Sequence, residues 1–457
     1  MSQKKGLNII IVGCGKVGVT LVEQLSKEGH DITIIDSNPV KIQEITNLYD
    51  VIGLTGNGAS YSVQMEAGIS NANLLISVTG SDELNLLCCT IARQVGKCAA
   101  IARVRTPDYS IEADYLRNKL GLAMIINPEL EAAKQIKNIL CLPTALEVNP
   151  FAHNQAEMIK YQLPENSVLD GLAIMELSKV SDYKILICAV EREGEIYIPS
   201  GTFTLKSGDT ISFVAPNKSA KGFLEQIGSK TNKVKDAMII GGGKVAFYLA
   251  ELLLKRGISV KMIEADKARC DELSILLPKA VIINGDGTDE ELLKEAGIEY
   301  AESFVPLTGM DEENIILTLY AKKTSDAKVV TKINRINFRK VIESLGLGSV
   351  IYPRYITSEA IIAYVRAKNN STDRNIETLY HMFDSRVEAI EFRVDEIKGL
   401  TNIPLKDLTL KKNILISLIN RKGKILIPNG LDSIMPGDSV VIVTTETGLS
   451  NIEEIVQ

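Results

Sequence analysis

The sequence predicts an α/β protein built from two Rossmann-like, doubly wound parallel-sheet domains, each followed by a small α+β module. Three observations lead to this prediction. Residues 8–39, NIIIVGCGKVGVTLVEQLSKEGHDITIIDSNP, follow the order strand, glycine loop, helix, strand, acid. Residues 238–266, MIIGGGKVAFYLAELLLKRGISVKMIEAD, follow the same order again. After residues 140 and 370, strand and helix cease to alternate and hairpin patterns take over.

Length and composition favour a soluble protein of several domains. A chain of 457 residues is too long for one compact core. Its content of 45% hydrophobic and 24% charged residues is close to the globular average. The longest apolar runs, such as Ile9 to Val12, are far shorter than the roughly 20 residues that span a bilayer. We therefore expect a chain that is neither secreted nor membrane-spanning, and the net charge of −6 gives no reason to expect nucleic acid as its partner.

The cysteines and histidines indicate a reducing compartment and no metal site. Seven cysteines are an odd number, they include no Cys-x-x-Cys pair, and only three histidines accompany them. This pattern argues against structural zinc and against a disulfide framework, and it fits the cytoplasm. His30 precedes a strand and is expected at the surface.

The internal repeat extends through the whole chain. Gly13 matches Gly241 and Asp36 matches Glu264 at one spacing, since 241 − 13 and 264 − 36 both equal 228. After one inserted residue the spacing is 229, and residues 56–58 and 79–85 match 285–287 and 308–314. Residues 192–201 match 421–430 in the same way. The protein is therefore predicted to be a tandem duplication of a two-part unit.

We expect four domains, with strands in the first at Asn8–Val12, Ile32–Asp36, Val51–Leu54, Leu74–Val78 and Ala99–Val104. The Rossmann-like domains are predicted at 1–138 and 234–368, and the α+β modules at 139–228 and 369–457. The polar stretch QIGSKTNKVKD, residues 226–236, is the expected linker between the halves. Within the first module, YKILICAVEREGEIYIPSG predicts two strands joined by a turn at Gly194.

The first glycine loop has the chemistry of a dinucleotide site. Gly13, Gly15 and Gly18 occupy the three positions of G-x-G-x-x-G, which permit a tight turn, close approach of a pyrophosphate, and packing of the helix on the strand. Phosphates would then bind the exposed N–H groups at the helix start. Asp36 follows at the end of the second strand, where a carboxylate accepts hydrogen bonds from ribose hydroxyls. Because it would repel a 2′-phosphate, it favours NAD over NADP.

The second loop departs from this pattern. Ala246 replaces the third glycine, and Glu264 is a longer acid that can still reach a ribose. This half is therefore either a second nucleotide site or a domain kept as a scaffold.

Other polar residues have both a ligand role and a plain structural explanation. Lys16 and Lys244 lie inside the loops, where they could approach phosphates or simply face solvent, and Cys14 is interpreted as a small residue that fits a turn. The stretch 79–82 follows the fourth strand at the ligand edge of the sheet, although Ser81 or Asp82 would also serve as a helix N-cap. Arg103 and Arg105 point to one face, as phosphate partners or in salt bridges.

The chain lacks the groups expected of a dehydrogenase, which needs an acid, a base or a metal near the nicotinamide. The modules contain only His153 and His381, and neither lies in a repeated motif. We therefore expect no catalytic residues and a nucleotide that is sensed and not consumed. The alternative is a soluble NAD-dependent oxidoreductase with a duplicated Rossmann fold.

Several motifs occur together in this chain: the glycine loop with Asp36, the stretches EAGISNANLLISVTGSDELN and IARVRTPDY, and a module with IPSG and Gly208-Asp209. In this combination the chain resembles the TrkA family, the regulatory subunits of bacterial Trk potassium-uptake systems. The resemblance covers essentially the whole chain. It implies two domains that regulate K⁺ conductance (RCK), binding of NAD(H) and possible binding of ATP or ADP, and assembly as a ring of four chains. It also implies a position on the cytoplasmic face of the cell membrane, against a TrkH-like potassium channel or transporter subunit.

The resemblance also implies which residues contact the nucleotide. In the first half these are Gly13, Cys14, Gly15, Lys16, Val17, Asp36, Asn57, Thr79, Gly80, Arg103 and Arg105, with Gly18 completing the glycine motif. In the second half the matching residues are Gly241, Gly242, Gly243, Lys244, Val245, Glu264, Asp286 and Thr308. Lys332 and Asn334 stand where the first half has its two arginines, so we expect weaker phosphate recognition there.

Overall fold

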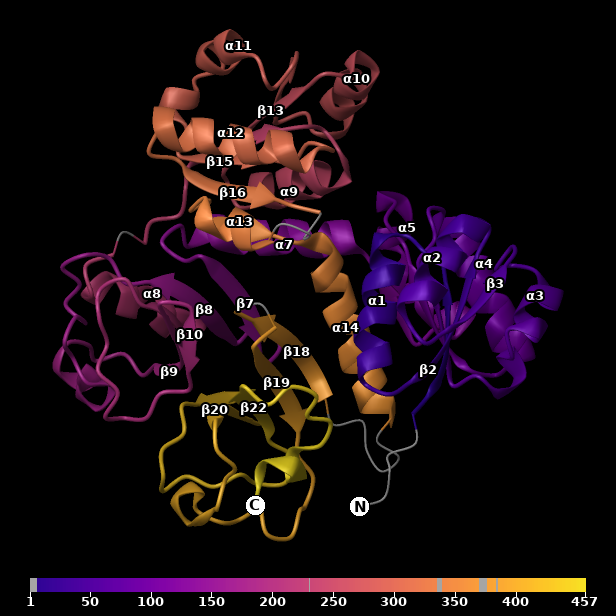
Figure 1. Cartoon of the computed structure of the whole chain (residues 1–457). Coiled ribbons are helices and arrows are strands. Elements are labelled where there is room, and N and C mark those ends of the chain that lie inside the picture. The colour runs from indigo at the N-terminus through magenta and orange to yellow at the C-terminus, as the bar shows by residue number, and fades with distance from the viewer. Residues whose placement is uncertain (1–5, 230, 335–338, 370–375, 384) are drawn as a thin grey trace. The chain divides into compact units, whose positions relative to one another are not determined.

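A computed structural model describes residues 6–229, 231–334, 339–369, 376–383 and 385–457 (Figure 1). The chain forms two compact units, one of residues 1–132 with 352–362 and the other of residues 133–351 with 363–457. The first unit holds one parallel sheet, and the second holds another parallel sheet and both antiparallel sheets. No helix of the described residues is both long enough and apolar enough to cross a membrane.

The first Rossmann-like domain has six parallel strands in the order β3-β2-β1-β4-β5-β6. Strand order reverses at β1 and β4, and ligands of such folds bind at the carboxyl ends of the strands beside this point. The strands are β1 Asn8–Val12, β2 Asp31–Asp36, β3 Ile52–Thr55, β4 Leu74–Ser77, β5 Ala99–Arg103 and β6 Met124–Ile126. The helices are α1 Lys16–Lys27, α2 Pro39–Leu48, α3 Tyr61–Glu66, α4 Asp82–Val95, α5 Pro107–Ile111, α6 Ala113–Leu120 and α7 Pro128–Cys141.

The fold class predicted from the sequence is confirmed, and all five predicted strands of this domain lie within one residue of their observed ends. The sequence did not reveal β6, because three residues are too few for a periodic pattern. The surface position expected for His30 is wrong. Its side chain is buried, and its Nδ1 accepts a hydrogen bond from the backbone N–H of Leu7 at 3.1 Å, which ties the approach to β1 against β2.

The second Rossmann-like domain repeats this topology, with the order β14-β13-β12-β15-β16-β17. Its strands are β12 Asp236–Ile240, β13 Ser259–Glu264, β14 Val281–Asn284, β15 Ser303–Pro306, β16 Lys328–Lys332 and β17 Ser349–Ile351. Its helices are α9 Lys244–Lys255, α10 Lys267–Leu276, α11 Glu290–Glu295, α12 Asp311–Thr324 and α13 Arg339–Ser344, with a 3-10 turn, η3, at Ile298–Tyr300. The helix that follows, α14 Pro353–Asn369, begins in the first unit and ends in the second.

Each α+β module is a five-stranded antiparallel sheet. The first has the order β10-β9-β11-β8-β7, and the second has the order β18-β19-β22-β20-β21. The elements of the first are β7 Glu147–Phe151, β8 Ala156–Gln162, β9 Leu186–Arg192, β10 Glu195–Tyr197, β11 Thr210–Pro216 and α8 Asn217–Gln226. The strands of the second are β18 Ile376–Met382, β19 Val387–Arg393, β20 Ile414–Arg421, β21 Lys424–Leu426 and β22 Ser439–Thr444.

The repeated Gly-Asp pair of the modules is explained by a buried carboxylate. Asp209 accepts two hydrogen bonds of 2.7 Å from the guanidinium of Arg192 at the end of β9. In the second module Asp438 accepts from Arg421 at 3.0 and 2.8 Å. Gly194, in the turn that follows Arg192, has a φ of +82° and closes the predicted hairpin. A bidentate pair of this kind fixes one end of each sheet.

The two modules share one hydrophobic core inside the second unit. Phe151, Met158 and Val214 of the first module pack in the same cluster as Met382 and Leu418 of the second. A hydrogen bond of 3.2 Å from the backbone N–H of Ala152 to the carboxylate of Glu391 crosses this contact. An ion pair of 2.8 Å between Arg386 and Glu191 crosses it as well. The modules of one chain are therefore packed together as a pair.

A buried ion pair joins α14 to the second module. The guanidinium of Arg366 donates two hydrogen bonds of 3.0 Å to the carboxylate of Glu388 on β19, and His381 lies 3.2 Å from the same carboxylate. Burial alone would raise the pKa of Glu388, but the hydrogen bonds from His381 and Arg366 outweigh it and lower this pKa to about 2. The pair is thus charged throughout the physiological range.

Glu388→Gln should destabilise the second unit by about 3–5 kcal/mol, because it removes the charged acceptor of two guanidinium hydrogen bonds inside a buried ion pair. The folded-state pKa lies below the ordinary value of 4.5, so the stabilisation is complete above that value and is lost as the pH falls toward 2. The difference in melting temperature between wild type and variant, measured by calorimetry, should therefore be constant from about pH 7 to about pH 5 and shrink as the pH falls further toward 3. The exposed Glu396→Gln is the control. An unchanged melting temperature for Glu388→Gln at neutral pH would contradict the stabilising role of this ion pair.

Candidate nucleotide-binding site

The glycine loop between β1 and α1 leaves open space above the start of the helix. Gly13 has a φ of +103°, and a Cβ there would lie 2.9 Å from the backbone nitrogen of Thr79. A Cβ at Gly18 would lie 2.0 Å from the carbonyl oxygen of Gly13. Among the described residues, no heavy atom lies within 4 Å of a Cβ placed on Gly15. Two of the glycines therefore allow close packing of the backbone, whereas the third borders empty space.

The start of α1 has the properties of an anion site. Gly15 is its N-cap, no side chain caps the first turn, and the first turn contains no acidic residue. The first N–H groups of a helix lack partners within the helix, and the helix dipole favours negative charge there. α9 begins in the same way after Gly243. Lys16 is exposed at the start of α1, while Val17 is buried and faces the core.

Asp36, at the end of β2, holds the loop. Its Oδ2 accepts a hydrogen bond of 2.6 Å from the backbone N–H of Cys14, and its Oδ1 accepts one of 2.9 Å from Asn38. Each carboxylate oxygen keeps a further lone pair for a ribose hydroxyl. Burial, together with the negative charge of Asp36, raises the pKa of the Cys14 thiol to about 12, so this cysteine remains a neutral, small apolar side chain.

The two arginines predicted from the sequence both reach the loop between β4 and α4. The guanidinium of Arg103 donates to the carbonyl oxygen of Thr79, and that of Arg105 donates to the carbonyl oxygen of Gly80. Burial lowers the pKa of Arg103, which nevertheless stays cationic. Because the backbone of Thr79 lies against Gly13, these arginines lie beside the glycine loop, and within the described part of the chain no heavy atom comes within 4 Å of a Cβ placed on Gly80.

Asp82 is not the N-cap of α4, which was one of the two roles that its position in the sequence suggested. Ser81 is the N-cap of α4, since its hydroxyl accepts from Leu84 at 3.1 Å. Asp82 instead accepts from the backbone N–H groups of Arg105 and Thr106, at 2.9 and 2.8 Å. Burial alone would raise the pKa of Asp82, but the hydrogen bonds from Thr106 and Arg105 lower it. Asp82 thereby fixes the segment that carries Arg105.

A residue that the sequence patterns did not single out lies at the centre of this edge. Asn85 is fully buried, and its side chain bonds Thr79 and the carbonyl oxygen of Arg103. Its counterpart Asn314 makes the corresponding bonds to Thr308 and Lys332. The sequence did contain a signal, because this asparagine ends the stretch that recurs in both halves.

Asn57 lies at the same edge, after β3. It is exposed, and its side-chain oxygen accepts a hydrogen bond of 3.0 Å from the backbone N–H of Ala59. In the second half Asp286 has this position and accepts from Thr288 at 2.9 Å, which lowers the pKa of Asp286. Each of these side chains shapes the loop that follows its strand.

The second glycine loop is held more tightly than the first. Glu264 accepts a hydrogen bond of 2.5 Å from the backbone N–H of Gly242, as Asp36 does from Cys14. A Cβ on Gly242 would lie 2.6 Å from the side chain of Leu273 and 3.0 Å from the Glu264 carboxylate, so glycine leaves room for both the leucine and the longer acid. Arg269, which the sequence patterns also did not single out, donates to the carbonyl oxygen of Gly242 at 2.8 Å. The peptide groups on either side of Gly242 are therefore both held.

The remaining predicted residues of the second half surround an equivalent edge. Gly241 has a φ of +95°, Lys244 starts α9 and Val245 is buried. Lys332 donates to the carbonyl oxygen of Leu307 at 2.9 Å. The side-chain nitrogen of Asn334 donates to Asp311 at 3.0 Å. One lysine thus stands where the first half offers two guanidinium groups.

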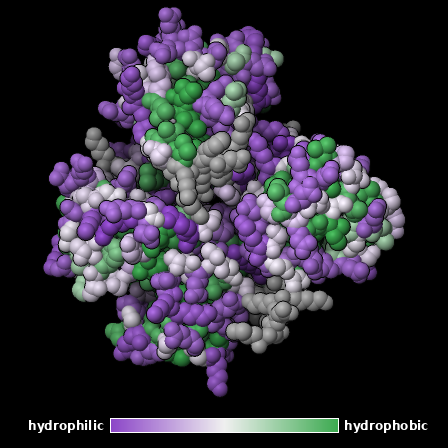
Figure 2. Space-filling view, in the orientation of Figure 1, coloured by the Kyte–Doolittle hydropathy of each residue, from purple (hydrophilic) through white to green (hydrophobic). Residues whose placement is uncertain are grey.

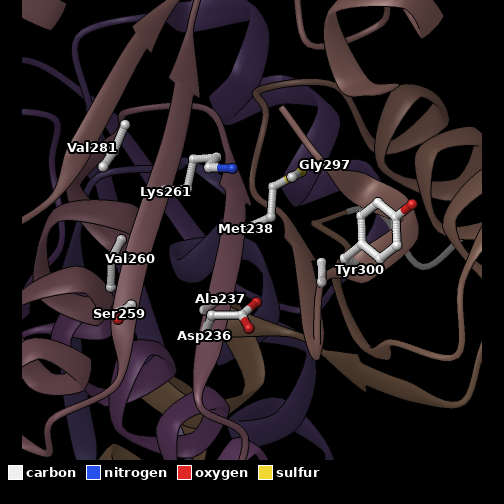
Figure 3. A pocket seen from close by; sticks show the side chains of 10 residues that line it. Asp236, Ala237, Met238, Ser259, Val260, Lys261, Val281, Gly297 and Tyr300 are labelled. Carbon is white, nitrogen blue, oxygen red and sulfur yellow. The ribbon is translucent and has the colours of Figure 1, made fainter. Parts of the chain in front are cut away.

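A cavity of about 360 Å³ lies at the opposite edge of the second sheet, where the strands begin (Figure 3). Asp236, Ser259 and Val281 line it from the starts of β12, β13 and β14. Figure 3 shows Lys261 pointing from β13 toward Gly297. Because doubly wound folds bind nucleotides where their strands end, this cavity is separate from the predicted site.

Two domain families match the chain, each of them twice. The TrkA-N domain matches residues 9–128 and 237–353, and the TrkA-C domain matches residues 158–228 and 389–457. The chain belongs to the TrkA family. The Trk system potassium uptake protein TrkA homolog 1 of Methanosarcina mazei is 31% identical over 98% of this chain and 99% of its own length. The Trk system potassium uptake protein TrkA of Haemophilus influenzae is 29% identical, with 98% of each chain covered.

Solved structures with this fold include the GsuK channel, with a TM-score of 0.66 over 97% of this chain and 77% of that one. The GsuK channel bound to NAD gives 0.64 with the same coverage, and the GsuK RCK domain gives 0.64 with 93% of its chain covered. At 16% identity these structures show that the duplicated fold is shared. The family and fold expected from the sequence are thus confirmed.

Gly18→Ala should destabilise the first unit by about 1–3 kcal/mol, because the added methyl group would displace the carbonyl of Gly13. A drop in melting temperature is the readout. Gly80→Ala is the control, since its methyl group would enter open space. An equal melting temperature for wild type and Gly18→Ala would show that the loop accommodates the methyl group at no cost.

Proposed function

We propose that this TrkA-family protein is a cytoplasmic sensor of nucleotides that regulates potassium uptake. NAD(H) binds the first half at the carboxyl edge of its sheet, and ATP or ADP compete for the same edge. The change in conformation on binding acts on a TrkH-like potassium channel or transporter subunit. The protein catalyses no reaction.

The observation that carries the proposal is the convergence of three loops on one open edge. The uncapped start of α1 is suited to a pyrophosphate, and the carboxylate of Asp36 is suited to a ribose. The guanidinium groups of Arg103 and Arg105 are suited to a further phosphate. On this proposal Asn57, Thr79 and Gly80 complete the walls of the site. The open space at Gly15 is where a phosphate can approach the backbone.

The arginines supply a way for phosphate to change the conformation. In this structure they donate to two backbone carbonyls of the loop between β4 and α4. An anionic phosphate is a stronger acceptor than a neutral carbonyl, so a bound phosphate would draw Arg103 away from that loop. Arg105 also lies 3.5 Å from the carboxylate of Asp82, so a phosphate would compete for it with that charge as well as with the carbonyl of Gly80. A ligand shifts the equilibrium between two conformations only through its different affinity for them, and this exchange of partners provides such a difference.

The second half is proposed to be the weaker sensor. It has one cationic side chain, Lys332, where the first half has two arginines, and Arg269 closes its glycine loop from the other side. Lysine offers a point charge, whereas arginine can bind a phosphate with two parallel hydrogen bonds. Ligands rich in phosphate, such as ATP, should therefore prefer the first half.

The partner and the location are proposed from the family. Relatives covering nearly the whole chain are named potassium uptake proteins of Trk systems. Assembly into a ring of four chains would also bury exposed apolar side chains on two equivalent helices, α4 and α12. Leu87 on α4 and Ile316 on α12 are 51% and 66% exposed, and Figure 2 shows apolar surface in the region of α12.

Asp36→Ala should weaken NADH binding by about 1–3 kcal/mol, because it removes the acceptor of the ribose hydroxyls and releases the Cys14 N–H. Glu264→Ala is the matched variant of the second half and should leave most ATP and NADH binding intact. Calorimetric titration of the full chain with each nucleotide measures both effects, while a constant NADH absorbance would accord with binding without turnover.

Potassium uptake by cells that carry each variant then tests regulation. Wild type and Glu264→Ala should respond to changes in cellular NADH, and Asp36→Ala should not. Equal NADH affinity for wild type and Asp36→Ala would place the site elsewhere, and tighter ATP binding through the second half would reverse the proposed order of the sensors.

A further inference from the structure

The side chain of Asn85 is surrounded by the backbone of the proposed site and has no contact with solvent. Its relative exposure is 0%. The side-chain oxygen accepts hydrogen bonds from the backbone N–H of Thr79 at 2.8 Å, from the hydroxyl of Thr79 at 2.7 Å and from the hydroxyl of Ser77 at 2.9 Å. The side-chain nitrogen donates to the carbonyl of Arg103 at 2.9 Å and to that of Thr79 at 3.4 Å.

These partners determine the orientation of the amide. A backbone N–H can only donate and the two carbonyls can only accept, so exchanging the oxygen and nitrogen would set donor against donor and acceptor against acceptor. Both ends of the Asn85 amide are therefore required.

The glycine loop, the loop after β4 and the end of β5 all contact Thr79, and Asn85 bonds Thr79 from the buried side. The backbone of Thr79 lies against Gly13 so closely that a Cβ on this glycine would be 2.9 Å from the Thr79 nitrogen. The carbonyl of Thr79 accepts from the guanidinium of Arg103, whose own backbone carbonyl accepts from Asn85. The glycine loop, the loop after β4 and the end of β5 are thus joined through one buried side chain.

The second half has kept the same arrangement. Asn314 is also fully buried, and its oxygen accepts from the N–H and the hydroxyl of Thr308, each at 2.9 Å. Its nitrogen donates to the carbonyl of Lys332 at 3.0 Å. The bond to a serine is absent because Pro306 stands at the position of Ser77. The cation at the end of the fifth strand differs between the halves, but the asparagine beneath it does not.

We propose that Asn85 is the positioning residue of the first nucleotide site: it fixes Thr79 and the end of β5 relative to the glycine loop, so that a bound nucleotide meets all three loops in register. This inference rests on the proposed function of the same edge. Asn85 itself does not touch the ligand, because its polar atoms are all engaged with Ser77, Thr79 and Arg103.

Asn85→Asp tests this proposal through a pH profile. The ionised carboxylate keeps the acceptor but loses both donors, and it faces the carbonyls of Thr79 and Arg103. The protonated acid has nearly the shape of asparagine and can donate to Arg103 again. Burial raises the pKa of a carboxyl group at this position, so protonation is expected at mildly acidic pH.

The measurement is NADH affinity of the full chain between about pH 8 and about pH 6, a range above the isoelectric point of 5.5. Affinity of the variant is divided by that of wild type at each pH. This division cancels the pH dependence that the variant shares with wild type. The charged and titratable groups near position 85 are Arg103 at the end of β5, Arg105 in the segment that follows, and Asp82, Cys88 and Cys89 on α4.

We expect a loss of about tenfold or more for Asn85→Asp at the alkaline end that shrinks as the pH falls. Asn85→Leu, which has a similar volume and no polar atoms, should lose affinity to the same extent at every pH. Asn314→Asp is the matched control, and it should bind NADH in the first half as wild type does. If the buried charge unfolds Asn85→Asp at alkaline pH, its affinity at the acidic end is compared with that of Asn85→Leu and should be higher.

Three other outcomes would contradict the proposal, each in a different way. A loss that does not vary with pH, or equal binding by Asn85→Asp and Asn85→Leu at the acidic end, would show that position 85 contributes only to packing. Wild-type affinity in both variants would show that the loops are positioned without this side chain. Failure of wild type itself to bind NADH would refute the proposed function and not the role of Asn85 alone.

Discussion

One hydrogen bond in each half, from the middle of the glycine loop to the acid that ends the second strand, fixes the geometry on which the site depends. Asp36 holds the N–H of Cys14 at 2.6 Å, and Glu264 holds that of Gly242 at 2.5 Å. Because the loop is fixed there, α1 starts with its N–H groups facing open space and the backbone of Gly13 lies against Thr79. The acid therefore has a structural task in the ligand-free protein in addition to any ribose contact.

The duplication shows which parts of this design can change. The acid and the loop residue change together, since Asp36 occurs with Cys14 and the longer Glu264 occurs with Gly242. The buried asparagine beneath the fourth-strand loop does not change. The cations around the edge do change, because Lys332 and Asn334 replace the arginine pair of the first half. In addition, Arg269 on α10 bonds the second glycine loop. A fixed backbone frame thus carries two different charge distributions, as expected if the halves respond to different ligands.

Sequence patterns predicted the strands and the ligand edge because these depend on local periodicity and on glycine spacing. The five strands from Asn8 to Arg103 are apolar runs bounded by turn residues, and the repeat confirmed their order. The roles of Asn85 and Arg269 could not be predicted in this way, because each depends on which backbone groups the folded chain brings beside it. The position of His30 was predicted wrongly for the same reason, since only the fold shows that its side chain is buried and accepts a hydrogen bond from Leu7. The assignment of individual residues to nucleotide contacts remains a prediction.

The central claim is that nucleotide binds the carboxyl edge of the first sheet and engages the segments that follow β1, β2, β4 and β5. Hydrogen–deuterium exchange of the full chain with and without NADH tests this claim most directly, because it reports on every loop in one experiment. We predict slower exchange at residues 13–18, 36–38, 79–81 and 103–106, with little change at 236–238 and 259–261, which line the cavity at the opposite edge of the second sheet. Protection confined to that cavity, or to the second glycine loop, would contradict the claim.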